Sequence, residues 1–227
     1  MKKKRGKSRL TDNSFWMSTG DLMAGVLFIF VLLFVVQLLN VQTELEKKEK
    51  TIQELASVKN KIINKLNKKF EGDTSKINID SKTGSITLDE KILFDSNKST
   101  LKPEGKKYLK EFIPQYVDLL LGDDEIAKSL DRIIIEGHTD DIGGYFYNLE
   151  LSQKRAYSVV EYIFKEMGDF NKKSLLKKYI TANGRSDVNL KYNSDGSVNR
   201  RKSRRVEFQF KLRNDETLDK VLKTLKE

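Results

Sequence analysis

Residues 132–167 read RIIIEGHTDDIGGYFYNLELSQKRAYSVVEYIFKEM, and this stretch joins a strand pattern directly to a helix pattern. The segment RIIIEGHTD is a short apolar run and predicts a buried strand. From Leu151 to Met167, apolar residues recur at the spacing of an amphipathic helix. A buried strand followed by such a helix is typical of folds in which helices cover a sheet, so the stretch predicts an α/β domain.

Further strand patterns flank this stretch on both sides. The segment INIDSKTGSITLDEKILF (77–94) predicts two alternating strands around a turn at 82–84, and KYITANG (178–184) and RRVEFQFKL (204–212) predict two more. Pro103 is expected to begin a helix that Pro114 kinks or restarts. We expect residues 73–213 to form one α/β (α+β) sandwich domain, a mixed sheet with helices on one face. Residues 214–227 would be a C-terminal tail.

Composition argues against an enzyme. The 227 residues include no cysteine and one histidine, His138. Disulfides, thiolate metal sites and cysteine nucleophiles are therefore excluded, and a Ser–His hydrolase has little to work with. A lone histidine at a strand end is more often a hydrogen-bonding turn residue than a catalyst, so His138 is assigned a structural role. We expect no catalytic residue, no metal and no cofactor.

The N-terminal region contains a membrane-length apolar run. Leu22 to Leu39 is interrupted only by Gln37, which gives about 27 Å of helix at 1.5 Å per residue. A hydrocarbon core is about 30 Å thick, and Trp16 suits a headgroup boundary. We expect one transmembrane helix at residues 14–40. A signal peptide is disfavoured because the run is long and no small-residue cleavage site follows it.

The distribution of charge predicts the orientation in the membrane. The chain carries a formal charge of +10, and residues 2–9, just before the apolar run, hold six lysines and arginines. Cations gather on the cytoplasmic side of membrane helices. Residues 1–13 are therefore expected to form a cytoplasmic tail, and the remainder should lie beyond the inner membrane, in the periplasm.

Residues 41–72 are expected to form a helical stalk. Apolar and lysine residues recur there in steps of three and four, beginning in the apolar run: Leu38, Val41, Leu45, Lys48, Ile52, Leu55, Lys59, Ile62 and Leu66. Two interpretations stay open: the seam joins two helices in a coiled coil, or one amphipathic stalk lies on the next domain. Gly72 stands where a helix would stop.

Four motifs within residues 77–212 resemble, in order, the OmpA-like peptidoglycan-binding domain. They are LFDSNKSTLKPEGKKYL, IIIEGHTDDIG, NLELSQKRAYSVVEYI and RRVEFQF. The resemblance implies that Asp140 and Arg155, fifteen residues apart as in the family pattern, bind diaminopimelate in the peptidoglycan stem peptide. Asn148 is expected to add a polar contact. Peptidoglycan is thus the expected partner of this domain.

The residue types suit such a ligand. Asp140 follows a buried strand, at the end where α/β sheets collect ligands, and Arg155 is expected in the first turns of a helix that starts at Leu151 and Ser152. The Asp140 carboxylate can pair with an ammonium group, and the Arg155 guanidinium can donate two hydrogen bonds to a carboxylate. Backbone amides near Asp141 and Gly143 can also bind the ligand carboxylate. The alternative is that Asp140 and Arg155 pair with each other and pin a loop.

The last motif departs from the family pattern. Ser203 stands where the family usually has Asn before Arg-Arg-Val-Glu, which weakens any assignment of Arg204 or Arg205 to the ligand. The basic cluster consists of Arg200, Arg201, Lys202, Arg204 and Arg205. Its charge alone permits nucleic-acid binding, but for a domain outside the cytoplasm an anionic wall polymer is the expected partner, and no nucleic acid.

A single carboxylate, Asp21, lies near the start of the apolar run. Ser18, Thr19, Gly20 and Asp21 all favour N-cap positions, and if Asp21 only marks the helix start, the chain is a passive tether to the wall. The alternative rests on the helix face. Asp21 would share that face with small residues, Ala24 and Gly25, that permit close helix approach, and an acid inside a membrane helix is functional by default.

The membrane segment resembles the B subunits of ion-driven stators. Trp16 to Asp21 echo the flagellar pattern Trp-x-x-x-x-Ala-Asp, with Gly20 in place of Ala. TGDLMAGVLFIFVLLF looks closest to the Zorya anti-phage branch of these subunits. The resemblance implies that Asp21 carries the ion and that a homodimer sits within a pentameric ring of a ZorA/MotA-like membrane subunit. A single carboxylate serves H⁺ or Na⁺, of which we expect H⁺. A flagellar stator subunit, the alternative, would carry a short plug helix after the span.

Overall fold

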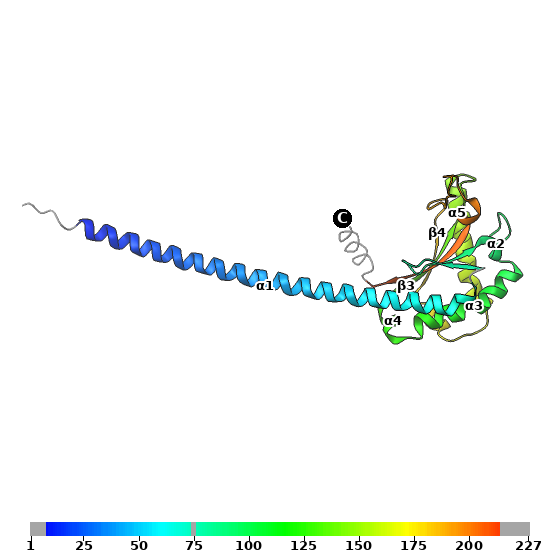
Figure 1. Ribbon diagram of the computed structural model, residues 1–227, viewed down its shortest axis with the longest axis horizontal. Coiled ribbons are helices and arrows are strands. Elements are labelled where there is room, and N and C mark those ends of the chain that lie inside the picture. The colour runs from blue at the N-terminus through cyan, green and yellow to red at the C-terminus, as the bar shows by residue number, and fades with distance from the viewer. Residues whose placement is uncertain (1–7, 74–75, 214–227) are drawn as a thin grey trace, which may run out of the picture. The chain divides into compact units, whose positions relative to one another are not determined.

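The computed structural model describes residues 8–73 and 76–213, with side chains from Thr19 onward (Figure 1). The expected C-terminal tail and the first half of the expected cytoplasmic tail lie outside the described residues. By its internal contacts the chain divides into two compact units, residues 1–52 and 53–227. The second unit thus begins about twenty residues before the domain boundary predicted at residue 73.

The described residues of the first unit form the N-terminal part of one helix, α1 (Ser8–Phe70). Within the described residues, α1 is the one helix long and apolar enough to cross a membrane. Its most apolar eighteen-residue window has a mean hydropathy of 2.9, and none of that window is buried within the chain. The predicted membrane segment therefore has the length, composition and exposure that a bilayer requires.

The last turns of α1 belong to the second unit and bury one apolar face against it. The buried residues are Leu55, Val58, Ile62, Ile63, Leu66 and Phe70. A 3₁₀ turn, η1 (Glu71–Asp73), follows and contains Gly72, the predicted stop. The upper seam, Leu38, Val41 and Leu45, is exposed in the described part of the chain. The lower stalk thus lies on its own domain, and a coiled coil stays a prediction for the upper seam.

Charged and aromatic contacts hold this part of α1 in place. Lys65 Nζ lies 2.6 Å from Asp123 Oδ2, and Lys61 Nζ lies 2.5 Å from Glu125 Oε2. These lysines hold the pKa of the Asp123 carboxyl well below its usual range. The ring of Phe70 lies 5.2 Å from that of Phe112. The segment is therefore tied to its domain along its length.

The second unit is built on a five-stranded mixed sheet with strand order β1-β2-β5-β3-β4. The strands are β1 (Ile77–Ile79), β2 (Ile86–Asp89), β3 (Leu130–His138), β4 (Ile180–Gly184) and β5 (Arg205–Leu212). β3 and β4 pair in parallel, and the other neighbours are antiparallel. All five strands were predicted from alternating or continuous apolar patterns.

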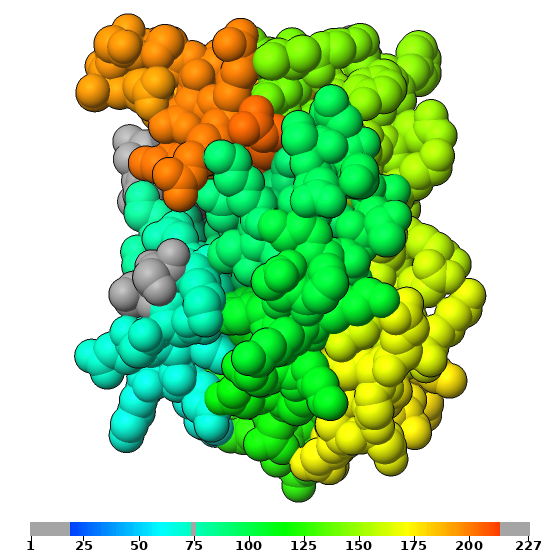
Figure 2. Space-filling view, turned by 90° about the vertical axis from the view of Figure 1, so that its right-hand side faces the viewer, coloured from blue at the N-terminus to red at the C-terminus, as the bar shows by residue number. Residues whose placement is uncertain are grey.

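Two long helices, α3 (Pro103–Leu121) and α5 (Tyr145–Lys165), pack against the sheet. The Phe112 ring of α3 lies edge-on to Phe208 of β5, with the centroids 5.0 Å apart. α5 connects β3 to the parallel strand β4 and contacts both. Figure 2 shows the outer surface of α3, in green, between the end of α1 and residues near 170. The predicted α/β sandwich, a mixed sheet with covering helices, is confirmed.

Two helix predictions need correction. α3 continues through Pro114 as one helix, so the expected restart there is wrong, while a kink at Pro114 stays a prediction. α5 begins at Tyr145, six residues before the predicted start at Leu151. Its N-cap is Gly144, which has no side chain to accept a hydrogen bond, so the usual polar start signal is missing. Ser152 lies inside the helix and donates to the carbonyl of Leu149. Arg155 is therefore in the third turn.

Shorter helices complete the unit: α2 (Glu90–Leu93), α4 (Asp124–Ser129), α6 (Lys173–Leu176) and α7 (Arg200–Ser203). Paired glycines let α5 approach the ends of the parallel strands. Gly137 of β3 is the register partner of Gly184 of β4. A Cβ on Gly137 would lie 2.2 Å from the Ser152 carbonyl oxygen, and one on Gly184 would lie 2.5 Å from the Gln153 nitrogen. Any larger residue would push α5 away from the sheet.

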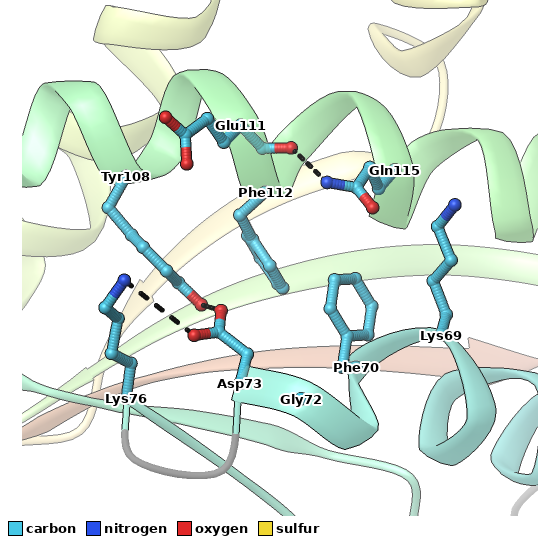
Figure 3. Close-up of a pocket in the computed structure, with 9 residues that line it drawn as sticks. All are labelled: Lys69, Phe70, Gly72, Asp73, Lys76, Tyr108, Glu111, Phe112 and Gln115. Carbon is cyan, nitrogen blue, oxygen red and sulfur yellow. Dashed lines mark hydrogen bonds and ion pairs between the residues drawn. The ribbon is translucent and has the colours of Figure 1, made fainter.

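A hollow of about 310 Å³ lies where α1 meets α3 (Figure 3). The Tyr108 hydroxyl donates to Asp73 Oδ2 at 2.7 Å, and Lys76 Nζ lies 5.2 Å from the centre of the Tyr108 ring. Burial, together with the Asp73 carboxylate, raises the pKa of Tyr108. Asp140, Asn148 and Arg155 do not line this hollow. It marks the joint between stalk and domain.

The two halves of the stalk should respond differently to the same substitution. Leu66 is 0% exposed and Leu45 is 61% exposed. Leu66→Ala should lower the free energy of unfolding by about 3 kcal/mol because it leaves a cavity. Leu45→Ala should change it by less than about 0.5 kcal/mol. Urea unfolding of the full chain in detergent, followed by circular dichroism, measures both. A Leu66→Ala cost below about 1 kcal/mol would contradict the packing of the lower stalk.

Candidate functional site

Strand directions bring three chain segments together at one end of the sheet. β2 and β3 are each antiparallel to β5, and Arg205 is the register partner of both Asp89 and His138. Asp89, Arg205 and His138 thus lie side by side at one end of the sheet. The segments after β2, after β3 and before β5 therefore come together beyond them. Figure 2 shows this convergence at the top, where segments near residues 95, 145 and 195 touch. The predicted ligand residues lie at this end.

Four charged side chains there form a continuous ion-pair chain, Asp140–Arg204–Glu90–Arg155. Arg204 Nη1 donates to Asp140 Oδ2. Its Nε lies 3.8 Å from Glu90 Oε2, and the same carboxylate oxygen accepts from Arg155 Nη1 at 2.7 Å. Two acids and two bases alternate, so the formal charges of the ion-pair chain sum to zero. Such networks satisfy charge that would be costly to bury alone.

The two ends of the ion-pair chain differ in exposure. The Arg155 side chain is 2% exposed, and its partner Glu90 is buried as well. Arg155 Nε donates to the carbonyl of Lys98 at 2.9 Å, and the guanidinium lies 5.5 Å from the centre of the Phe94 ring. Burial raises the pKa of the Glu90 carboxyl despite the arginines beside it, and burial lowers the pKa of the Arg155 guanidinium. This end is an internal ion pair.

The other end reaches the surface. The Arg204 side chain is 29% exposed, while Asp140 is largely buried beneath it. Asp140 Oδ1 accepts a hydrogen bond from the Ile142 backbone at 3.1 Å, so the carboxylate is held in place from below. A ligand arriving from solvent would meet Arg204 and Asp140 before any other member of the ion-pair chain.

Asn148 lies beneath the loop that follows β3. Its side-chain amide donates to the carbonyls of Asp140 at 3.3 Å and Gly143 at 3.5 Å, and Gly143 has a φ of +98° that favours glycine. Asn148 is fully buried in this position. In this arrangement it holds the loop that carries Asp140, and the polar contact to ligand that was expected of it stays a prediction.

Asp140 and Arg155 are not paired with each other. Each has another partner, so the alternative in which the two pin a loop by a direct ion pair is wrong. Sequence reasoning missed Glu90 and gave little weight to Arg204. The predicted strands could have pointed to Glu90 and Arg204, because both residues lie at strand ends. Only the register between β2, β5 and β3 shows that these ends coincide.

Most of the basic cluster is neutralised by neighbouring acids. Arg200 forks onto Asp141 with distances of 2.8 and 3.1 Å, and it lowers the pKa of that carboxyl. Arg201 Nε lies 3.1 Å from Asp89 Oδ2, and Arg205 Nε donates to Glu207 at 2.6 Å. With Arg204 on Asp140, four arginines are each paired. This surface offers little of the free positive charge that phosphate binding requires.

His138 ends β3 on the sheet face opposite α3 and α5. Its Nδ1 lies 3.3 Å from the Val188 carbonyl oxygen, and its Nε2 lies 3.1 Å from Glu136 Oε1. Glu136, His138 and Glu207 are close enough to surround a metal ion. Arg205 already donates to Glu207, however, so a guanidinium provides the positive charge. This arrangement suits the structural role predicted for His138.

Asp21 lies well inside α1. The helix begins at Ser8, thirteen residues earlier, so Asp21 cannot cap its N-terminus and the N-cap interpretation is wrong. The side chain is exposed within the single chain. Gly20 and Gly25 beside it have open space where a Cβ would stand. This face of α1 therefore presents one acid among small residues and is exposed as far as the described part of the chain shows.

The fold and the site define the second unit as an OmpA-like domain, joined to a long helix of membrane-spanning composition. Residues 93–204 match the OmpA family. The chain is 29% identical to the Zorya protein ZorB of Escherichia coli strain Crooks, over 87% of this chain and 88% of that protein. It is 28% identical to ZorB of strain E24377A, over 91% and 84%. The chain is thus ZorB-like and carries an OmpA-like domain.

A solved structure supports the fold. A putative MotB-like protein from Desulfovibrio vulgaris superposes with a TM-score of 0.53 at 20% identity, over 72% of this chain and 96% of that one. At this identity the likeness bears on the fold alone. None of the proteins and families named here is an enzyme.

Neighbouring acids should differ sharply in their contribution to stability. Glu90→Gln leaves the buried Arg155 guanidinium without a counter-charge and should lower the free energy of unfolding by about 3 kcal/mol. Asp89→Asn removes an exposed pair with Arg201 but keeps a side chain able to cap α2, and should cost less than about 1 kcal/mol. Urea unfolding of the two full-length variants compares them. Equal losses would contradict the internal role of the Glu90–Arg155 pair.

Proposed function

We propose that the chain is an ion-conducting, peptidoglycan-anchored stator subunit of a Zorya-type anti-phage defence complex. It would couple proton flow through Asp21 to rotation of a partner ring. The observation that carries the proposal is similarity to ZorB along both the membrane helix and the domain. In this arrangement the N-terminus is cytoplasmic, α1 crosses the inner membrane once, and the OmpA-like domain lies in the periplasm. The six N-terminal cations support that orientation.

The membrane part of the proposal rests on the exposed face of α1 around Asp21. Small residues there permit another helix to approach closely, so a second copy of the chain and a surrounding ZorA/MotA-like pentameric ring would enclose the acid. A carboxyl group in such a site is neutral with its proton and charged without it. Access that alternates between the two sides of the membrane moves one proton per cycle, which is worth about 2.3 kcal/mol per 100 mV.

The domain supplies the stationary mount that torque requires. Asp140 is a carboxylate held in place at the surface end of the ion-pair chain, with arginine beside it. That pair of charges matches the ammonium and carboxylate at the free end of diaminopimelate in a stem peptide. The long helix from Thr19 to Phe70 supports the Zorya branch over the flagellar one, for which a short plug helix is expected.

Wall binding should depend on the charge of Asp140. Asp140→Asn keeps an oxygen that can accept from the Ile142 amide but removes the charge that would hold an ammonium, so sedimentation with purified peptidoglycan should fall at least tenfold. Asp141→Asn, which alters an exposed ion pair next to it, is the matched control and should sediment like the unaltered chain. Equal sedimentation of the two variants would show that the pocket is misassigned.

Defence should depend on a titratable group at position 21. Asp21→Asn retains size and polarity but cannot release a proton, so protection against phage in plaque assays should be abolished. Membrane insertion and peptidoglycan sedimentation of the same variant should match the unaltered chain and serve as internal controls. Full protection by Asp21→Asn would contradict ion conduction and leave a passive tether.

A further inference from the structure

The start of α5 carries an exposed apolar surface beside the loop that holds Asp140. Residues 142–149 read IGGYFYNL, eight uncharged residues in a chain that is 33% charged. We call the four large exposed residues of this run the aromatic rim: Ile142, Tyr145, Phe146 and Tyr147. Phe146 is 82% exposed. Contiguous apolar side chains that stay exposed mark interaction surfaces, so the rim is a candidate binding surface.

The local fold keeps these rings exposed and also holds them in place. Successive residues of a helix point about 100° apart, so three aromatic residues in a row cannot all face the sheet. The Ser186 hydroxyl donates to the Tyr145 carbonyl at 2.9 Å, and the rings of Tyr145 and Phe146 lie edge to face with centroids 5.4 Å apart. A Cβ on Gly143 would lie 3.1 Å from Tyr147 Cδ1, so this ring lies against the loop. The rim is therefore formed before any ligand arrives.

The aromatic rim adjoins Asp140. The Ile142 amide donates to Asp140 Oδ1 at 3.1 Å, and the Asn148 side chain donates to the Asp140 carbonyl at 3.3 Å. Phe146 precedes Asn148 by two residues in the same helix. In a stem peptide, diaminopimelate is the third residue from the sugar, and three extended residues reach about 10 Å. A sugar whose stem peptide ends at Asp140 is thus within reach of the rim.

We propose that the aromatic rim binds the glycan strand, with the Phe146 ring stacked on the face of an N-acetylated sugar. The inference rests on the proposed peptidoglycan-binding function and adds to it a subsite for the sugar. A β-linked sugar ring with equatorial substituents presents C–H groups on its flat faces, which match an aromatic face. The hydroxyls of Tyr145 and Tyr147 can bond to the polar edge of such a sugar.

The charge of the surface agrees with this ligand. The glycan strand is uncharged where the sugar's lactyl carboxylate forms the amide bond to the stem peptide, and residues 142–149 are uncharged as well. The acids on either side of this run are already paired: Asp141 with Arg200, and Glu150 with Lys154. Binding a neutral sugar there leaves both ion pairs in place.

The size of the surface favours a sugar over a second copy of the chain. A stable protein interface buries about 800 Å² of each partner, contributed by about twenty residues or more. The aromatic rim has four residues, and the paired charges of Asp141 and Glu150 follow directly on its two sides. Four rings and side chains of this kind match the area of one or two sugar units.

The test compares two soluble peptidoglycan fragments by calorimetry with the full chain in detergent. One is the stem tripeptide ending in diaminopimelate, with its amino terminus acetylated, and the other is the same tripeptide attached to its disaccharide. The unaltered chain should bind the disaccharide-linked fragment at least about fivefold more tightly. Phe146→Ala should bring this ratio close to one and leave the affinity for the free tripeptide within twofold. The exposure of Phe146 means that the variant keeps its fold.

Matched variants separate stacking from other effects. Tyr157→Ala removes a 51% exposed ring from the same helix, eleven residues and about 16 Å further on, and should preserve the ratio. Phe146→Trp should also preserve it, because the flat face remains. Phe146→Leu keeps an apolar side chain without that face and should lose most of the preference. A full preference in Phe146→Leu would overturn the stacking role.

The outcomes distinguish this inference from the function on which it rests. If the unaltered chain binds neither fragment, anchoring through this end of the sheet fails and the inference fails with it. If it binds both fragments equally, anchoring stands and the sugar subsite is overturned. If Phe146→Ala keeps the ratio but changes the oligomeric state in sedimentation velocity, the aromatic rim is a protein interface and the inference is likewise overturned.

Discussion

The buried ion pair between Arg155 and Glu90 is the constraint on which the site depends. A guanidinium inside a domain requires a counter-charge, and Glu90, the first residue of α2 directly after β2, supplies it. The pair therefore ties the helix after β3 to the strand next to β5. Both of its members are buried, so it organises the sheet end without being available to solvent. The pair of Asp140 with Arg204, whose side chain is the more exposed of the two, adjoins it through Glu90.

Local patterns in the sequence were sufficient for most of the fold. Alternation in β2 and β5 and the helical spacing of α5 each report burial of one face, while the continuous apolar run of β3 reports a strand buried on both faces. The start of α5 escaped prediction because Gly144 caps it without a side chain. The partners of Asp140 and Arg155 escaped for a different reason. They depend on the register of three strands distant in sequence, and no local pattern encodes which strand ends coincide.

The same spacing of apolar residues runs along the whole stalk, but its lower part is buried and its upper part is exposed. Its heptad seam runs through the division between the two units, yet Leu55 to Phe70 are covered by the domain while Leu38 to Leu45 are not. The spacing of apolar residues indicates that one helix face is buried. It does not indicate whether a sheet, a helix or a second chain covers that face. The ion pairs of Lys61 and Lys65 with the acids before and within α4 identify the cover for the lower half.

Charge balance links the two functional parts of the proposal. In the proposed membrane site, a lone acid would do work because its charge changes with each proton, so its surroundings would have to tolerate both states. In the wall-binding site the opposite is required, because a mount has to hold while the ring turns. The ion-pair chain Asp140–Arg204–Glu90–Arg155 suits that requirement, since its formal charges sum to zero and each member has a partner.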